Sequence, residues 1–146
     1  MTIKCPICCS EELRVVAVPR EIGADDGTLL GYADELFECV KCGEHFYSHG
    51  QAMASSRSRA AALRTHERLL TPAEIRDIRG RFDLSQADLE ALLGVGAKTV
   101  VRWERGTVCQ SRAVDALLRI LEYFGPAVFD CVKEGRAAGP GPRRPQ

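Results

Sequence analysis

The sequence predicts an α+β protein in which a small β-rich module precedes an all-helical domain of about five helices. Runs of β-branched and aromatic residues, separated by turn-forming residues, fill the first part of the chain, whereas helical periodicity begins at Thr71. The length of 146 residues suits one domain or two small ones. We expect a β-rich module at 1–47, a partly helical linker at 48–70, a helical domain at 71–133 and a disordered tail at 134–146.

Two runs in the N-terminal module have the composition of paired strands. LRVVAVPREI (13–22) and LLGYADELFEC (29–39) are separated by the turn-like GADDGT, and a short strand in EHFYS follows. A module of this size buries little apolar surface. Below about 40 to 50 residues, such a module usually needs a metal or a disulfide to fold.

The cysteine spacing predicts a metal site in this module. Cys5 and Cys8 form one Cys-x-x-Cys pair, and Cys39 and Cys42 form a second pair after 30 intervening residues. Two such turns direct four thiolates to one ion in tetrahedral geometry, which suits structural Zn²⁺ and leaves no open position for catalysis. CPIC and CVKCG resemble the metal-binding turns of zinc ribbons and rubredoxins, so the spacing does not separate zinc from iron.

Several alternatives to this ligand set stay open. A redox Cys-x-x-Cys is disfavoured because such motifs occur singly beside a βαβ pattern, which the sequence lacks. Cys9 could replace Cys8, although Cys8 preserves the two-residue spacing of the second pair. The other cysteines and the histidines have simpler interpretations, as buried residues in helical context (Cys109, Cys131) and as surface or linker residues (His45, His49, His66).

The helical part of the chain carries clear start signals. Thr71, followed by Pro72 and Glu74, forms a capping box with proline at the first helical position, and Ser85 and Ser111 are further N-caps. Gly94-Val95-Gly96 predicts a turn between the second and third helices, and Gly106 ends the third helix, AKTVVRWERG. A last short helix that starts at Pro126 carries Val128, Phe129 and Val132. The residues expected on the apolar faces of the other helices are Ile75, Ile78, Phe82, Leu84, Leu89, Leu92, Leu93, Val100, Trp103, Val114, Leu117, Leu118, Leu121 and Phe124.

The formal net charge of zero hides an asymmetry along the chain. Residues 1–56 carry four basic and nine acidic side chains, a net charge of −5, and the remaining residues carry +5. This division indicates two modules with different partners, of which the basic one suits nucleic acid. No run of 18 apolar residues and no signal peptide is present, so we expect a cytoplasmic protein.

The segment LSQADLEALLGVGAKTVVRWERG resembles the Xre/Cro-type helix-turn-helix, in which the third helix of the domain lies in the major groove of DNA. The whole arrangement, with CPIC, CVKC, a linker, LTPAEIRDIR and RWERG in this order, is similar to the MqsA/YgiT-type antitoxins of bacterial toxin–antitoxin systems. The resemblance extends over about residues 3–125.

This resemblance suggests which residues contact DNA. The family's recognition-helix Asn falls on Lys98 and its base-contacting Arg on Arg102, so one position departs from the family and the operator sequence should differ. Arg and Lys both bind guanine in the major groove, and an exposed Val101 can contact a thymine methyl. A solvated helix face is the alternative interpretation. The expected DNA-binding residues are Lys98, Thr99, Val101, Arg102, Gln86 as a phosphate contact and Arg105, with Arg81 and Arg112 as non-specific additions.

The resemblance implies an antitoxin rather than an enzyme. The N-terminal module would neutralise a cognate toxin, which in this family is often an mRNA-cleaving ribonuclease, and the helical domain would repress its own operon. A homodimer formed through the apolar surface of residues 111–133 would bind a palindromic operator. The runner-up hypothesis is a stand-alone zinc-containing transcriptional regulator. A metalloenzyme is the weakest, since the sequence shows no open metal position, convergent His/carboxylate pair or phosphate loop.

Overall fold

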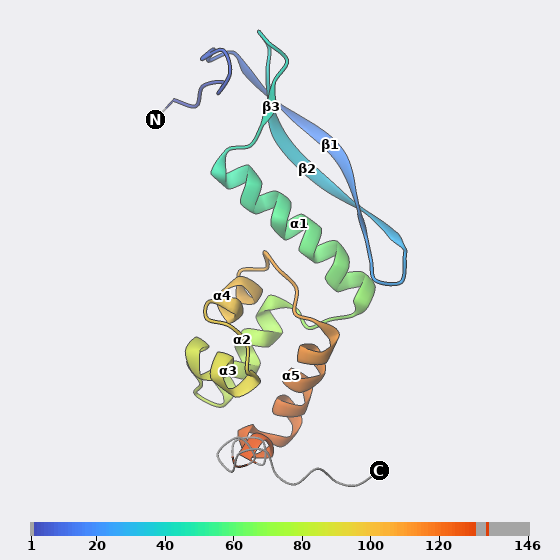
Figure 1. The fold of residues 1–146 in the computed structure, drawn as a ribbon, viewed down its shortest axis with the longest axis vertical. Coiled ribbons are helices and arrows are strands. Elements are labelled where there is room, and N and C mark those ends of the chain that lie inside the picture. The colour runs from blue at the N-terminus through green and yellow to red at the C-terminus, as the bar shows by residue number, and fades with distance from the viewer. Residues whose placement is uncertain (1, 131–133, 135–146) are drawn as a thin grey trace, which may run out of the picture. The chain divides into compact units, whose positions relative to one another are not determined.

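The computed structural model describes residues 2–130 and 134 and divides into two compact units (Figure 1). The first unit holds the described residues up to Leu69 together with Arg105–Cys109, and the second holds Leu70–Glu104 and the described residues from Gln110 onward. The expectations for Cys131, Val132 and nearly all of the tail fall outside the described residues. Among the helices that the structure describes, none is long and apolar enough to cross a lipid bilayer.

The first unit is built on an antiparallel sheet with the strand order β1-β2-β3. β1 (Leu13–Gly23) and β2 (Leu29–Cys39) pair along their whole length, and β3 (His45–Phe46) adds a short third strand next to β2. The two long strands coincide with the runs expected from the sequence, and β3 lies within EHFYS. Because Leu13 lies opposite Cys39, the hairpin brings the segments before β1 and after β2 to the same end of the sheet.

The segment expected to be a linker forms a continuous helix instead. Helix α1 (His49–Glu67) packs against β2 and belongs to the first unit (Figure 1). Ser48 caps it, because its hydroxyl accepts the N–H of Gln51 while the Gln51 side chain accepts the N–H of Ser48. The sequence conceals this helix because it is rich in Ser and Ala and lacks a broad apolar stripe; its buried residues are Ala60 and Arg64.

A buried carboxylate joins the sheet to the start of α1. Asp34 on β2 is only 2% exposed, its carboxylate accepts a hydrogen bond from the hydroxyl of Tyr47, and Arg20 Nε lies 3.4 Å away. Burial opposes ionisation of Asp34, but the hydrogen bonds from Tyr47, Ser55 and Arg20 outweigh it and lower the pKa of this carboxyl group. The charged form is therefore the one that the first unit stabilises.

The second unit is a small all-helical domain. It contains α2 (Pro72–Arg81), α3 (Gln86–Leu93), α4 (Thr99–Glu104), α5 (Arg112–Phe124) and a 3-10 helix at Pro126–Phe129. The expected caps form, since the side chains of Thr71, Ser85 and Ser111 each accept a backbone N–H in the first turn. The buried core consists of Leu70, Ile75, Ile78, Leu89, Val100, Trp103, Leu118, Leu121 and Phe129.

Two details of the helical part differ from the sequence prediction. Phe124 was expected in the core with Leu121, yet its side chain is 65% exposed and packs edge-on against Tyr123. The cause is its position as the last residue of α5, one residue before Gly125 turns the chain away with φ +76°. Cys109 was expected in a helix, but it lies in a half-buried loop of the first unit, where its thiol donates to the Ala60 carbonyl oxygen at 3.0 Å.

The turn between β1 and β2 is fastened by Asp26. Its carboxylate accepts the N–H of Thr28 at 2.9 Å and lies 2.9 Å from Nε2 of His66 on α1. The hydrogen bond from the Thr28 backbone, followed by that from His66, lowers the pKa of Asp26 to about 2. His66, expected as a surface or linker residue, is thus half-buried and links the end of α1 to the hairpin turn.

We predict that Asp26→Asn loosens the hairpin turn at neutral pH. The folded-state pKa of Asp26 lies below the unfolded value of ~3.9, so the ionised carboxylate stabilises the fold above pH ~4, and this contribution is lost as the pH falls through about 2. Hydrogen exchange of the Thr28 amide should be faster in the variant than in the wild type near pH 6, and the difference should decrease as the pH falls through about 2. Asp25→Asn is the matched control, and equal exchange in all three proteins near pH 6 would contradict the prediction.

Candidate metal centre and nucleic-acid interface

Four cysteine side chains converge at the open end of the β1–β2 hairpin. They are Cys5, Cys8, Cys39 and Cys42, and their sulfur atoms all lie within 4.8 Å of one another. The Sγ–Sγ distances are 3.6 Å between Cys5 and Cys42 and 3.5 Å between Cys8 and Cys39. A tetrahedral ion with metal–sulfur bonds of ~2.3 Å needs sulfur atoms about 3.8 Å apart. The donor set and its spacing therefore fit a metal ion held by protein ligands alone.

The two metal-binding turns have the same backbone geometry. The carbonyl oxygen of Cys5 accepts the N–H of Cys9 at 3.0 Å, and that of Cys39 accepts the N–H of Gly43 at 2.8 Å. Cys9 and Gly43 both have left-handed conformations, with φ of +57° and +74°. Cys9 is thus the counterpart of the glycine that closes the second turn, and it lies outside the group of four sulfur atoms. The ligand set is therefore Cys8 with Cys5, as the sequence spacing predicted, and Cys9 closes the first turn.

The first cysteine of each pair is buried. Cys5 and Cys39 are essentially inaccessible, with 1% and 0% of their surface exposed. The N–H of Ile7 points at Cys5 Sγ from 3.4 Å, so the backbone of the first turn also restrains this sulfur atom. The remaining two ligands are more exposed, so the metal centre lies at the surface of the first unit.

We predict that Cys9→Gly strengthens metal binding. A non-glycine residue with a left-handed backbone is strained by ~1 kcal/mol, and a glycine relieves this strain. Part of the gain is offset because glycine also gives the unfolded chain more conformational freedom. Metal retention, measured by competition with a chelator, should rise by a few-fold at most.

The matched control is Gly43→Ala, which introduces the same strain into the second turn, where an added Cβ meets nothing within 4 Å. Its metal retention should fall. Loss of the metal in Cys9→Gly would instead identify Cys9 as a ligand.

In the second unit, α3 and α4 are joined by a tight turn. Gly94, with φ +69°, ends α3, and the N–H of Val95 returns to the Glu90 carbonyl oxygen at 3.0 Å. α4 then places Val100 and Trp103 in the core, with 0% and 4% of their surface exposed. Two helices joined by this turn, with an inward aromatic residue on the second helix, have the layout that the predicted helix-turn-helix requires.

The predicted DNA contacts differ in their surroundings. Arg102 is exposed on α4, with Nη2 at 3.5 Å from Thr99 Oγ1, whereas Thr99 and Val101 are half-buried. Lys98 is exposed but lies before α4 in the left-handed conformation, with φ +62°, and not within the helix as the sequence suggested. Arg105 follows α4 and is grouped with the first unit, where its carbonyl oxygen accepts Nε of Arg57 at 3.3 Å.

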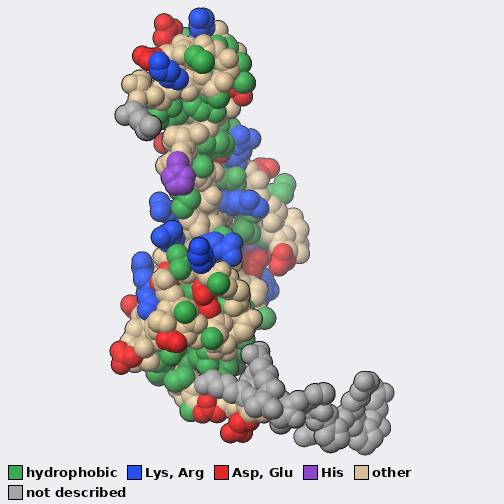
Figure 2. Space-filling view, turned by 60° about the vertical axis from the view of Figure 1, so that its left-hand side comes forward, with side chains coloured by type: hydrophobic (Ala, Val, Ile, Leu, Met, Phe, Trp, Pro, Cys, Tyr) green, Lys and Arg blue, Asp and Glu red, His purple; other side chains and the backbone are tan. Residues whose placement is uncertain are grey.

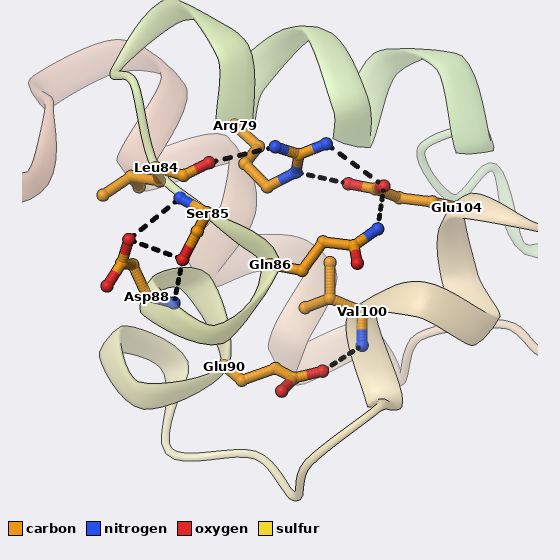
Figure 3. Close-up of polar contacts among 8 residues, drawn as sticks. All are labelled: Arg79, Leu84, Ser85, Gln86, Asp88, Glu90, Val100 and Glu104. Atoms are coloured by element: carbon orange, nitrogen blue, oxygen red, sulfur yellow. Dashed lines mark hydrogen bonds and ion pairs between the residues drawn. The ribbon is translucent and has the colours of Figure 1, made fainter.

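Gln86 takes part in a buried polar network that the sequence did not reveal (Figure 3). Its Nε2 donates to Glu104 Oε2 at 2.7 Å, so the side chain points inward to a carboxylate and is not free for a phosphate in this arrangement. Arg79 holds both oxygens of the same carboxylate, at 2.6 and 3.3 Å, and also donates to the Leu84 carbonyl oxygen at 3.0 Å. The hydrogen bond to Glu104 raises the pKa of Arg79.

This network could have been suspected from Arg79 alone. Arg79 shares the inward face of α2 with Ile75, Ile78 and Phe82, a position where an arginine needs an acceptor. The acceptor could not be identified from the sequence, because Glu104 lies 25 residues away and several acidic residues are closer. In the structure Glu104 is 6% exposed, and the pair fixes this last residue of α4 to α2 through two hydrogen bonds from one guanidinium group.

Comparison with known proteins supports the interpretation of both units. A family model described as "Antitoxin component of bacterial toxin-antitoxin system, MqsA" matches residues 3–130, which include the four cysteines and helices α2 to α5. Among curated protein sequences, none matches the chain. Since the family model extends over most of the 146 residues, the chain belongs to the MqsA family of antitoxins, components of bacterial toxin–antitoxin systems.

Proposed function

We propose that this antitoxin divides two tasks between its units. The first unit, closed by a structural Zn²⁺ on its four cysteines, binds and neutralises a cognate toxin. The second unit binds the operator of its own operon through α4 and represses transcription. The observation that carries the proposal is the pairing of a four-thiol centre with a helix-turn-helix in one chain of the MqsA family. Cytoplasm is the compartment in which both tasks would take place.

The donor set supports zinc as the proposed ion. Four thiolates at tetrahedral spacing suit Zn²⁺, which has no redox chemistry and imposes no other geometry. Such a site leaves no position for water or substrate, and so its role is structural. Because the first unit has few buried apolar side chains, among them Leu36, Ala60 and Leu69, metal binding would supply much of its folding free energy.

The charge of the first unit suits a basic toxin. The net charge of −5 over residues 1–56 belongs to the sheet, its turns and the metal-binding turns. Arg57 and Arg59 on α1 belong to the same unit, so the excess of acidic side chains lies in the sheet and its turns and not on α1. An acidic surface there steers a basic ribonuclease toward the unit and raises its association rate.

Exposed apolar side chains support a homodimer formed by the second unit. Ile120, Tyr123, Phe124 and Val128 on α5 and the following 3-10 helix are between 37% and 83% exposed. In Figure 2, apolar side chains gather at the lower end of this unit. Apolar residues that are clustered at a surface mark an interaction site, and a two-fold dimer would place two copies of α4 on a palindromic operator.

We predict that Arg102→Ala removes specific operator binding while the protein still neutralises the toxin. The loss of a bidentate contact to guanine costs about 1–3 kcal/mol per half-site. Binding should be measured with duplex DNA from directly upstream of the coding sequence and with a scrambled duplex of equal composition. Arg14→Ala, in the first unit, is the control and should bind as the wild type does. Unchanged discrimination by Arg102→Ala would show that α4 does not read the operator in this way.

We predict the opposite pattern for the double variant Cys39→Ala, Cys42→Ala. Without two of four thiolates the metal is lost and residues 1–47 unfold, whereas α2–α5 have their own core and stay folded. The variant should fail to bind the neighbouring gene product in titration calorimetry and fail to rescue growth, yet still bind the operator.

Retention of toxin binding by this variant would place the toxin site in the second unit. If the wild type does not bind the neighbouring gene product at all, the stand-alone regulator becomes the better description.

A further inference from the structure

The start of α4 is held differently from the starts of the other α-helices. α1, α2, α3 and α5 each follow a Ser or Thr whose side-chain oxygen accepts a backbone N–H of the first turn. The residue before α4 is Lys98, whose ammonium group is a donor only and cannot accept one. α4 has only six residues, so the N–H groups of its first turn form a large fraction of its backbone donors.

A side chain from α3 supplies the missing acceptor (Figure 3). Oε1 of Glu90 accepts the N–H of Val100 at 3.0 Å, while the N–H of Thr99 reaches the Gly96 carbonyl oxygen at 3.3 Å. Glu90 is 8% exposed and Val100 is fully buried, so water cannot readily replace the carboxylate. A negative charge at a helix N-terminus is also favourable for the helix dipole.

The two ends of α4 are therefore tied to the preceding helices by two buried carboxylates. Glu104 at the end of α4 is held by Arg79 and Gln86, and Glu90 holds the start from α3. Lys98, Thr99 and Arg102, the expected base contacts, lie at or near the start. Bidentate contacts to base edges require side chains placed to within a fraction of an ångström, so a displaced start would affect specific binding first.

We propose that Glu90 is a positioning residue for operator recognition: its carboxylate caps α4 from outside the helix and fixes the end that faces the bases. This proposal rests on the proposed function of the second unit in DNA binding. In this proposal Glu90 does not contact DNA, because its carboxylate acts through the backbone N–H of Val100. Non-specific attraction to phosphates depends on charge rather than on the exact placement of α4, and is expected to change little.

The cap is tested without DNA by comparing Glu90→Gln with Glu90→Met in the metal-loaded full-length protein. The two side chains have similar size, but only glutamine keeps an acceptor. The Val100 amide should exchange slowly with solvent in the wild type and in Glu90→Gln, and at least about tenfold faster in Glu90→Met. Glu74→Ala, which removes the capping carboxylate of α2, is the control and should leave Val100 exchange unchanged. Equal exchange in Glu90→Gln and Glu90→Met overturns the cap.

Operator recognition is then measured on the same proteins with the upstream duplex and the scrambled duplex. Glu90→Met should lose about tenfold in the ratio of specific to non-specific affinity, and Glu90→Gln should keep most of it. Trp103, the single tryptophan, reports by its fluorescence whether α4 remains packed. Should Glu90→Met not fold, Glu90→Ala, which leaves space for water at the Val100 N–H, takes its place.

The outcomes separate the inference from the function on which it rests. Fast Val100 exchange with an unchanged affinity ratio overturns the positioning role, although the cap stands. A wild-type protein that binds both duplexes equally refutes operator reading itself, and the positioning role is then overturned with it, whatever the exchange rates are. The proposal is supported if Glu90→Met shows both fast exchange of the Val100 amide and a reduced ratio of specific to non-specific affinity. Glu90→Gln and Glu74→Ala should show neither change.

Discussion

Helix α4 is too short to define its own position, and the second unit is organised around holding it. Six residues form few internal hydrogen bonds, so such a helix is not stable alone. Val100 and Trp103 attach it to the core by apolar contact, which is non-directional. The directional restraints come from Glu90 at its start and Glu104 at its end, both buried and both hydrogen-bonded to other parts of the unit. Apolar packing holds α4 in the domain, and the hydrogen bonds of the two carboxylates fix its orientation.

The β1–β2 hairpin of the first unit is also restrained at both ends by side chains rather than by a large core. At the open end, four thiols converge where β1 begins and β2 ends. At the closed end, Asp26 joins the turn to His66 on α1. Between them, Asp34 binds Tyr47 and Arg20 in a sheet with few buried apolar residues. Polar and metal-binding groups therefore restrain positions that a larger domain would fix with its core.

Features set by local chemistry could be predicted from the sequence, and those set by tertiary contact could not. The strands, the helix caps and the four clustered cysteines follow from alternation, from hydroxyl residues before helices and from spacing. For residues 48–70 the sequence predicted only a partly helical linker, because the segment has no recognisable apolar stripe that would indicate a helix packed on the sheet. Glu90 and Gln86 occur in patterns that resemble exposed helix positions, and only the fold shows that each side chain meets a buried partner. Phe124 was misplaced because the helix ends there.

The order of the chain also means that its two units cannot be separated by a single cut. The acidic and basic halves of the sequence do not coincide with the units, since the arginines of α1 belong with the acidic sheet. Arg105–Cys109 leaves α4 and joins the first unit, where Arg57 binds the Arg105 carbonyl oxygen and the Cys109 thiol binds that of Ala60. A fragment that ends near residue 68 would lose both contacts along one face of α1. Point substitutions at the four thiols and on α4 keep the chain of both units complete, and they therefore distinguish the roles of the units more cleanly than truncation does.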